Sequence, residues 1–151
     1  MSAQNFDQLE VGGIVAEAEL LFDRAALVRY AGASGDFNPI HFSDEIARSV
    51  GLEGVLAHGM LTMGAALQPL VNWLGDVTRV VDYQVRFTRP VWVEPGAGST
   101  VSVQVKFSGL DVDSDLAKFE LSALFAEKAV LGKAIALVRP VADTVSAASG
   151  R

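Results

Sequence analysis

Alternation of apolar and polar residues marks four segments of the chain as β-strands with one buried face. A period of two sends successive side chains to opposite faces of a strand. The four segments are residues 14–20, 81–88, 101–108 and 117–125. A fifth segment, residues 129–140, is apolar on both faces around Ile135 and Leu137, which predicts a strand at the centre of the sheet or at a subunit interface.

One helix, predicted from Gly59 to about Leu74, is apolar almost all round. Its few polar side chains leave no continuous polar face, and such a helix must be surrounded by protein. It is too short and too interrupted to cross a bilayer. Pro69 predicts a bend in this helix, or the end of its first segment.

Two shorter helices precede the apolar one. Asp23 is a suitable N-cap for a helix that ends before Pro39. Ser43 is a suitable N-cap for a short helix that ends near Gly51, and acidic residues in its first turn match the helix dipole.

Turn-like connections at residues 94–99, 109–115 and 127–132 predict that the later strands pair antiparallel in sequence order. Five strands and one apolar helix then predict an α+β domain, residues 1–140, in which a curled antiparallel sheet wraps around the helix. This arrangement is the hot dog fold. A two-layer sandwich of helices on a sheet satisfies the same pattern. Residues 141–151 have little to bury and are expected to form a mobile tail.

Composition and charge narrow the classes of function. The 151 residues are 50% hydrophobic and 20% charged, which is typical of a globular domain. The absence of cysteine excludes disulfides, thiolate metal sites and a cysteine nucleophile. A net charge of −6 without a basic block argues against nucleic acid as a partner. The first residues do not form a basic, then apolar, leader, so we expect a cytoplasmic protein.

The candidate chemistry lies between residues 36 and 59. Asp36 and His41 are five residues apart, and His58, the only other histidine, stands directly before Gly59 at the start of the apolar helix. An imidazole and a carboxylate can exchange protons, and the Gly59 N–H at the positive end of a helix dipole can hold a carbonyl oxygen that gains negative charge. The residues alone also fit an alternative in which Asp36 caps a turn, His41 is a buried structural imidazole and the His-Gly pair merely starts a helix.

A metal site is not predicted. The two histidines lie 17 residues apart, and together with Asp36 they match no common ligand spacing. The acidic run at residues 111–115 is better interpreted as a hairpin turn than as a calcium loop.

The segment from Tyr30 to Gly64, YAGASGDFNPIHFSDEIARSVGLEGVLAHGMLTMG, resembles the hydratase signature of the MaoC-like, (R)-specific enoyl-thioester hydratase family, which has the hot dog fold. The similarity continues through DYQVRFTRPVWV to GKAIALVRP and so spans nearly the whole chain except the tail. Within that family, the chain is most similar to the catalytic subunits of actinobacterial (3R)-hydroxyacyl-ACP dehydratases, which pair with a non-catalytic subunit.

The resemblance implies a hydro-lyase of fatty acid metabolism that adds or removes water at an acyl thioester, carried by coenzyme A or acyl carrier protein, without a cofactor. Asp36 and His41 would form the catalytic pair, and the Gly59 amide would bind the thioester carbonyl. Asn38 would hold the loop in shape and His58 would orient the start of the helix. A dimer is implied, either of two identical chains or with a non-catalytic hot dog subunit.

Two other functions use the same fold. A non-catalytic, acyl-binding partner subunit has no chemical need for both Asp36 and His41, which argues against that role. A hot dog thioesterase usually needs a carboxylate on the central helix, and Met60 to Leu74 contains none. Arg86 and Arg89 are candidate phosphate contacts, although exposed strand arginines are usually only solvated.

Overall fold

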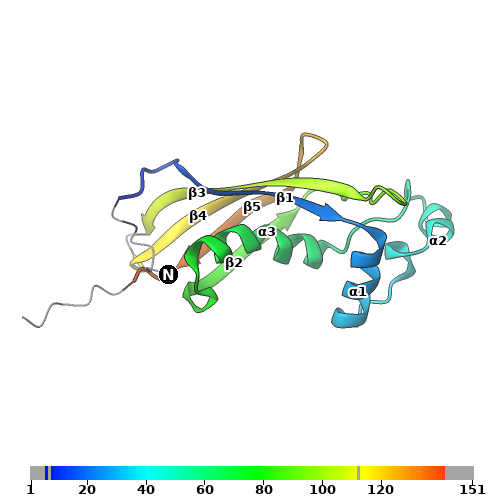
Figure 1. The fold of residues 1–151 in the computed structure, drawn as a ribbon, viewed down its shortest axis with the longest axis horizontal. Helices are drawn as coiled ribbons and strands as arrows, with labels where there is room; N and C mark the ends of the chain where they lie inside the picture. Colours follow the sequence, from blue (N-terminus) through cyan, green and yellow to red (C-terminus); the bar gives the residue numbers. More distant parts are fainter. Residues whose placement is uncertain (1–5, 7, 112, 142–151) are drawn as a thin grey trace, which may run out of the picture.

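A computed structural model describes residues 6, 8–111 and 113–141. Five antiparallel strands form one sheet in the order β1-β3-β4-β5-β2, and the sheet curls around helix α3 (Figure 1). This confirms the predicted curled sheet around an apolar helix. The strands are β1 (Ile14–Phe22), β2 (Val80–Phe87), β3 (Ser99–Asp111), β4 (Leu116–Phe125) and β5 (Lys128–Val138).

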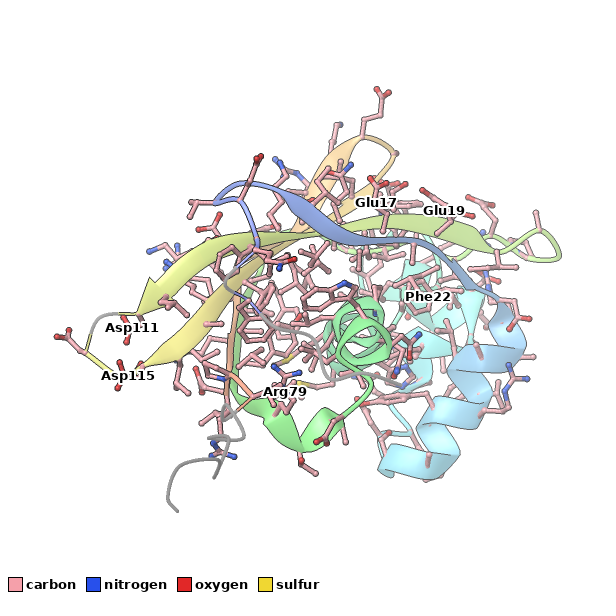
Figure 2. All side chains as sticks on the ribbon, turned by 60° about the vertical axis from the view of Figure 1, so that its left-hand side comes forward. Glu17, Glu19, Phe22, Arg79, Asp111 and Asp115 are labelled. Atoms are coloured by element: carbon pink, nitrogen blue, oxygen red, sulfur yellow. The ribbon has the colours of Figure 1, made fainter. Side chains whose placement is uncertain are left out.

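Alternation along the strands gives the sheet one buried, apolar face and one exposed face, as predicted. In β3 and β4 every second side chain is buried against α3: Val101, Val103, Val105, Phe107, Ala117, Phe119, Leu121 and Ala123. On the opposite, convex face, Glu17 and Glu19 of β1 point to solvent (Figure 2). At one end of the core, aromatic rings pack together, with Phe119 edge-on to Phe6 and Trp73 at centroid distances of 5.5 and 5.8 Å.

The apolar helix α3 (Gly59–Leu74) has the predicted bounds. One face packs on the sheet, but Met60 on the other face is 58% exposed, so this chain alone does not surround the helix. The expectation that Pro69 could end the first segment is wrong, because the helix runs through it. Pro69 is buried, and it removes a single backbone hydrogen bond from a helix of 16 residues.

The prediction that the strands pair in sequence order is wrong for β2. β3-β4 and β4-β5 are antiparallel neighbours, whereas β2 pairs with β5 and β1 pairs with β3. β2 does not pair with β3 because residues 88–98, which connect them, do not form a hairpin. Part of this segment pairs with residues 55–57 instead, where Ala57 N donates to Val91 O at 2.9 Å and Val93 N donates to Val55 O at 2.9 Å. The chain thereby crosses to the far side of the sheet before β3 begins.

The last strand differs from the prediction in two details. β5 is an inner strand between β4 and β2, and the middle of the sheet is β4. β5 also begins earlier than expected, at Lys128, because the connection is only two residues long. Ala126 and Glu127 both have positive φ, 47° and 60°, which is the backbone of a tight type I′ hairpin turn.

Three short helices gather at one end of the sheet (Figure 1): α1 (Arg24–Ser34), the 3₁₀ turn η1 (Pro39–His41) and α2 (Asp44–Ser49). The two predicted caps are confirmed. Asp23 Oδ1 accepts from Ala26 N at 2.6 Å, and Ser43 Oγ accepts from Ile46 N at 3.3 Å. A further 3₁₀ turn, η2 (Val77–Arg79), links α3 to β2.

Among the described residues, no helix has the length and apolar character needed to cross a membrane. The tail predicted at residues 141–151 lies outside the described residues apart from Val141.

Candidate active site

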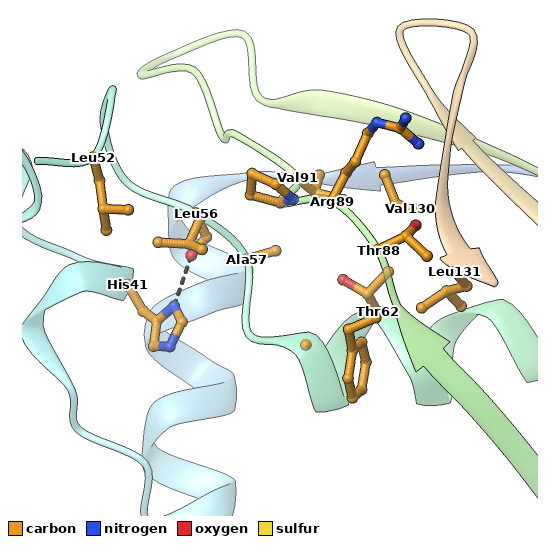
Figure 3. Close-up of a pocket in the computed structure, with 13 residues that line it drawn as sticks. His41, Leu52, Leu56, Ala57, Thr62, Thr88, Arg89, Val91, Val130 and Leu131 are labelled. Atoms are coloured by element: carbon orange, nitrogen blue, oxygen red, sulfur yellow. Dashed lines mark hydrogen bonds between the residues drawn. The ribbon is translucent and has the colours of Figure 1, made fainter.

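The predicted site residues come from two segments that meet beside the start of α3. Asp36 follows α1, His41 ends η1, and His58 directly precedes Gly59, the first residue of α3. His41 and Gly59 line the same cavity of about 410 Å³, together with Leu56, Thr62, Phe87 and Arg89 (Figure 3). Asp36 is not one of the residues that line this cavity. Its carboxylate instead faces the ring of His41, which does line it.

His41 is held in one tautomer. Its ring is almost buried, and Nδ1 lies 2.7 Å from the carbonyl oxygen of Leu56 (Figure 3). Because a carbonyl can only accept, Nδ1 of the neutral ring carries the hydrogen and Nε2 carries the lone pair. Nε2 is therefore the atom that can take a proton from a substrate.

The Asp36 carboxylate faces this nitrogen at a distance that suits a bridging molecule. Oδ2 lies 3.9 Å from His41 Nε2, which is too long for a direct hydrogen bond. A water placed about 2.8 Å from each atom can donate one hydrogen to the carboxylate oxygen and the other to the lone pair of Nε2. Half of the Asp36 side chain is exposed, at 51%, so such a molecule can exchange with solvent.

The loop that carries Asp36 is built from local side-chain hydrogen bonds. Gly35 reverses the chain with φ of 76° and caps α1. Asp36 Oδ1 accepts from Asn38 N at 3.2 Å, and Asn38 Oδ1 accepts from Ile40 N at 3.3 Å, which caps η1. Asn38 thus hydrogen-bonds within the loop between Asp36 and His41, in a position to fix the spacing between them.

His58 contacts Asp36 and His41 directly. Its Nε2 donates to the backbone carbonyl of Asp36 at 3.2 Å, and its ring stacks on the His41 ring at 3.8 Å with an interplanar angle of 23°. Tyr30 packs edge-on against the other side, 4.9 Å away. The His58 side chain therefore supports Asp36 and His41, and its role in orienting the helix start stays a prediction.

His58 stays neutral near pH 7. Burial lowers its pKa, and the hydrogen bond to the Asp36 carbonyl opposes that shift only in part. Its Nδ1 is buried without a partner among the described residues. A neutral ring at this position places no positive charge beside His41.

This environment makes stability sensitive to acid. A lowered pKa means that folded His58 binds fewer protons than the unfolded chain, so its contribution to stability is present above about pH 6.5 and is lost as pH falls below that value. We expect the free energy of unfolding to drop between pH 7.5 and 5.5 by more in the wild-type protein than in His58→Gln, with a limit of about 1.4 kcal/mol per pH unit for one proton. Urea unfolding of both proteins at the two pH values measures this difference. An equal drop in both would contradict the assignment.

Gly59 supplies both space and an amide. Among the described residues, no side chain caps the start of α3, which leaves its first N–H groups available at the positive end of the helix dipole. A Cβ atom on residue 59 would lie only 3.2–3.4 Å from the Phe87 ring. Glycine therefore keeps a gap open between the helix start and β2, at the wall of the cavity.

Three contributors were missed from the sequence: Leu56, Thr62 and Phe87. Thr62 is buried, lines the cavity and donates from Oγ1 to the His58 carbonyl at 3.3 Å. Its spacing of three residues from Gly59 places it on the same helix face, a signal that could have identified it. Leu56 acts through its backbone carbonyl, and Phe87 lies at the end of a strand, so neither carries a comparable signal.

The same residues can be considered as metal ligands. One ligand atom each from Asp36, His41 and His58 lies within 4.8 Å of the others. However, the two rings are stacked, so their in-plane lone pairs run side by side and do not converge on one point. His41 Nδ1 and His58 Nε2 are also already used on carbonyls. This donor set suits proton transfer better than a metal ion.

Comparisons with known proteins show sequence similarity to one family. Residues 10–121 match the family model described as MaoC like domain. The chain is 39% identical over 85 residues to 3-hydroxyacyl-thioester dehydratase X of Mycobacterium tuberculosis, covering 56% of this chain and 29% of that protein. It is 43% identical over 88 residues to the mitochondrial 3-hydroxyacyl-[acyl-carrier-protein] dehydratase of Arabidopsis thaliana, covering 56% of this chain and 50% of that protein. The matched regions thus span half or less of these curated relatives.

Solved structures share the fold. A MaoC-like dehydratase superposes with a TM-score of 0.86 at 35% identity, covering 92% of this chain and 43% of that chain. The (R)-hydratase from A. caviae involved in PHA biosynthesis superposes with a TM-score of 0.74 at 25% identity, covering 89% of this chain and 99% of that chain. In the second match, nearly the whole of that chain has the same fold as this one.

Proposed function

Because this chain belongs to the MaoC-like domain family, we propose that it is a hydro-lyase that removes water reversibly from a (3R)-hydroxyacyl thioester to give the 2-enoyl thioester. One observation carries the proposal: an imidazole nitrogen with a free lone pair and an amide at a helix N-terminus line one cavity. The dehydratases among its relatives support the same reaction class.

The geometry supports a reaction in which one proton is taken and returned. In the dehydration direction, His41 Nε2 accepts a proton from C2, and negative charge moves to the thioester oxygen, which the Gly59 N–H stabilises. The C3–O bond then breaks, and the imidazolium gives its proton to the departing hydroxyl, so that enoyl thioester and water are released. Asp36 accepts a hydrogen bond from the 3-hydroxyl and faces the imidazolium at 3.9 Å. Hydration is the reverse, starting from a water between Asp36 and His41.

The remaining contacts confine the proton exchange to one atom of His41, Nε2. The Leu56 carbonyl holds the hydrogen on Nδ1 throughout, so only Nε2 exchanges. His58 remains neutral beside the imidazolium and fixes the backbone of Asp36.

The cavity fits an acyl thioester. Its volume of about 410 Å³ is within the usual range for small-molecule sites, and apolar walls from Leu52, Leu56 and Val91 can hold an acyl chain. Arg89 also lines the cavity and is fixed by a bond from Nη1 to the Ala129 carbonyl at 3.0 Å. We propose that the phosphate of the carrier, coenzyme A or acyl carrier protein, lies on this side. Arg86 is exposed on β2 and does not line the cavity.

We also propose that the working form is a dimer, of two identical chains or with a non-catalytic hot dog subunit. Apolar side chains are exposed on the open face of α3 and on edge strand β2: Met60 at 58%, Val81 at 47% and Phe87 at 50%. A second subunit would cover these side chains.

The purified chain, assayed with crotonyl thioesters of coenzyme A and of a short thiol, tests the proposal. Loss of enoyl-thioester absorbance without release of free thiol is the expected result. Thiol release with the double bond intact would instead identify a thioesterase. No reaction of either substrate, or of longer acyl chains, would favour the non-catalytic partner role and contradict the proposal.

A further inference from the structure

The side chain of Arg24, the first residue of α1, ties together segments that are far apart in the chain. Nη1 and Nη2 donate to the two carboxylate oxygens of Asp44 at 2.9 and 3.0 Å, and Nε donates to the Val93 carbonyl at 2.7 Å. Both side chains are mostly buried, with 24% and 32% exposed. The guanidinium thus makes three short bonds in one plane, an arrangement that lysine cannot reproduce.

Asp44 connects Arg24 to a third segment of the chain, at Val55. Its Oδ1 accepts from Val55 N at 3.3 Å, and it is the first residue of α2, three residues after His41. Hydrogen bonds from Arg24 lower the pKa of Asp44, so the carboxylate remains charged well into the acid range. Arg24 and Asp44 therefore hold the backbone at Val55 on one side and at Val93 on the other.

Next to these two attachment points lies the carbonyl that sets the tautomer of His41. Residues 55–57 are not part of the five-stranded sheet. Within the described part of the chain they pair with residues 91–93, with an isolated bridge between Leu56 and Trp92. The Leu56 oxygen reaches His41 Nδ1 from the middle of this short ladder. The position of that oxygen depends on how the ladder is held at its Val55 and Val93 end.

We propose that Arg24 is a positioning residue for His41: through Asp44 and Val93 it fixes the Leu56 carbonyl, and thereby keeps the lone pair of the imidazole on Nε2. This inference rests on the proposed function, in which only that tautomer can accept the C2 proton. An ion pair with a purely structural role would stabilise the fold without changing the tautomer, so the two roles can be separated by experiment.

The test compares Arg24→Lys with Arg29→Lys. Arg29 lies on the same helix, 71% exposed and 3.8 Å from Asp23, and serves as the matched control. We expect Arg24→Lys to lower kcat on crotonyl-CoA by about tenfold to a hundredfold, with KM little changed. ¹⁵N-detected NMR of the histidine rings should show His41 shifting from the Nδ1–H form to a mixture of tautomers, while His58 keeps its Nε2–H form. The control should change neither the kinetics nor the spectra.

The outcomes separate this inference from the proposed function. If His41 keeps its Nδ1–H form in Arg24→Lys, the inference is wrong, whether or not kcat falls. If the tautomer becomes mixed but turnover is unchanged, Arg24 positions the ring as inferred, and the proposal that His41 is the base fails. Should Arg24→Lys not fold, Asp44→Asn replaces it, because asparagine keeps the size of the side chain and breaks one of the two bonds from Arg24. The same spectral result is then required.

Discussion

Replacement of Asp36 with asparagine, or of His41 with alanine, is expected to lower turnover of a 2-enoyl thioester by about 10²–10⁴-fold in each case while the protein stays folded. His41→Ala removes the imidazole whose free lone pair faces the cavity. Asp36→Asn keeps the shape of the side chain, but removes the negative charge that faces the imidazolium and replaces one acceptor oxygen with a donor. The rate of loss of enoyl-thioester absorbance measures the effect.

Asp111→Asn is the matched control for the aspartate, because Asp111 lies in the β3–β4 hairpin at the edge of the molecule (Figure 2). It should retain wild-type turnover. Circular dichroism and thermal unfolding should show all three variants folded, since Asp36 is half exposed and His41 belongs to the 3₁₀ turn η1, outside the sheet. Near-normal turnover in either site variant would remove the catalytic pair from the mechanism.

Gly59→Pro is expected to lower kcat by about 10²–10³-fold, close to 3 kcal/mol, because it deletes the amide hydrogen that faces the developing oxyanion. The fold should tolerate the change. Proline is favoured in the first turn of a helix, and His58 already has the extended backbone, φ −57° and ψ 132°, that a following proline requires. The loss of turnover should therefore exceed any loss in thermal stability.

Gly59→Ala is the control for this variant. It introduces the same Cβ atom, 3.2–3.4 Å from the Phe87 ring, but keeps the amide hydrogen. Phe87 is half exposed, so its ring can shift by a few tenths of an ångström, and we expect most of the turnover to remain. Equal losses in the two variants would mean that crowding, and not the missing hydrogen-bond donor, causes the effect.

Local signals predicted much of the fold. Periodicity identified the strands and the bounds of α3, and the residue types at Asp23 and Ser43 identified two helix starts, because these features depend on nearby residues alone. The neighbours of β2 could not be predicted in this way. They depend on the 88–98 segment, whose backbone pairs with residues 55–57 and not with its own flanks.

The site shows the same division between local and distant contacts. The sequence marked Asp36, His41, His58 and Gly59, and the structure brings them together. The sequence did not indicate Leu56, because the group that fixes the imidazole is a backbone carbonyl, and every residue has one. Arg24 was missed for a related reason: its partners lie 20 and 69 residues away along the chain.

The candidate chemical groups lie on residues 36–59, whereas the aromatic cluster around Phe119 combines residues of the sheet, the far end of α3 and Phe6. Substitutions of the chemical groups can therefore leave the aromatic cluster, and with it the fold, intact. After a gene duplication, one copy could lose its carboxylate and imidazole and still fold, remaining useful as a scaffold for its active sister chain.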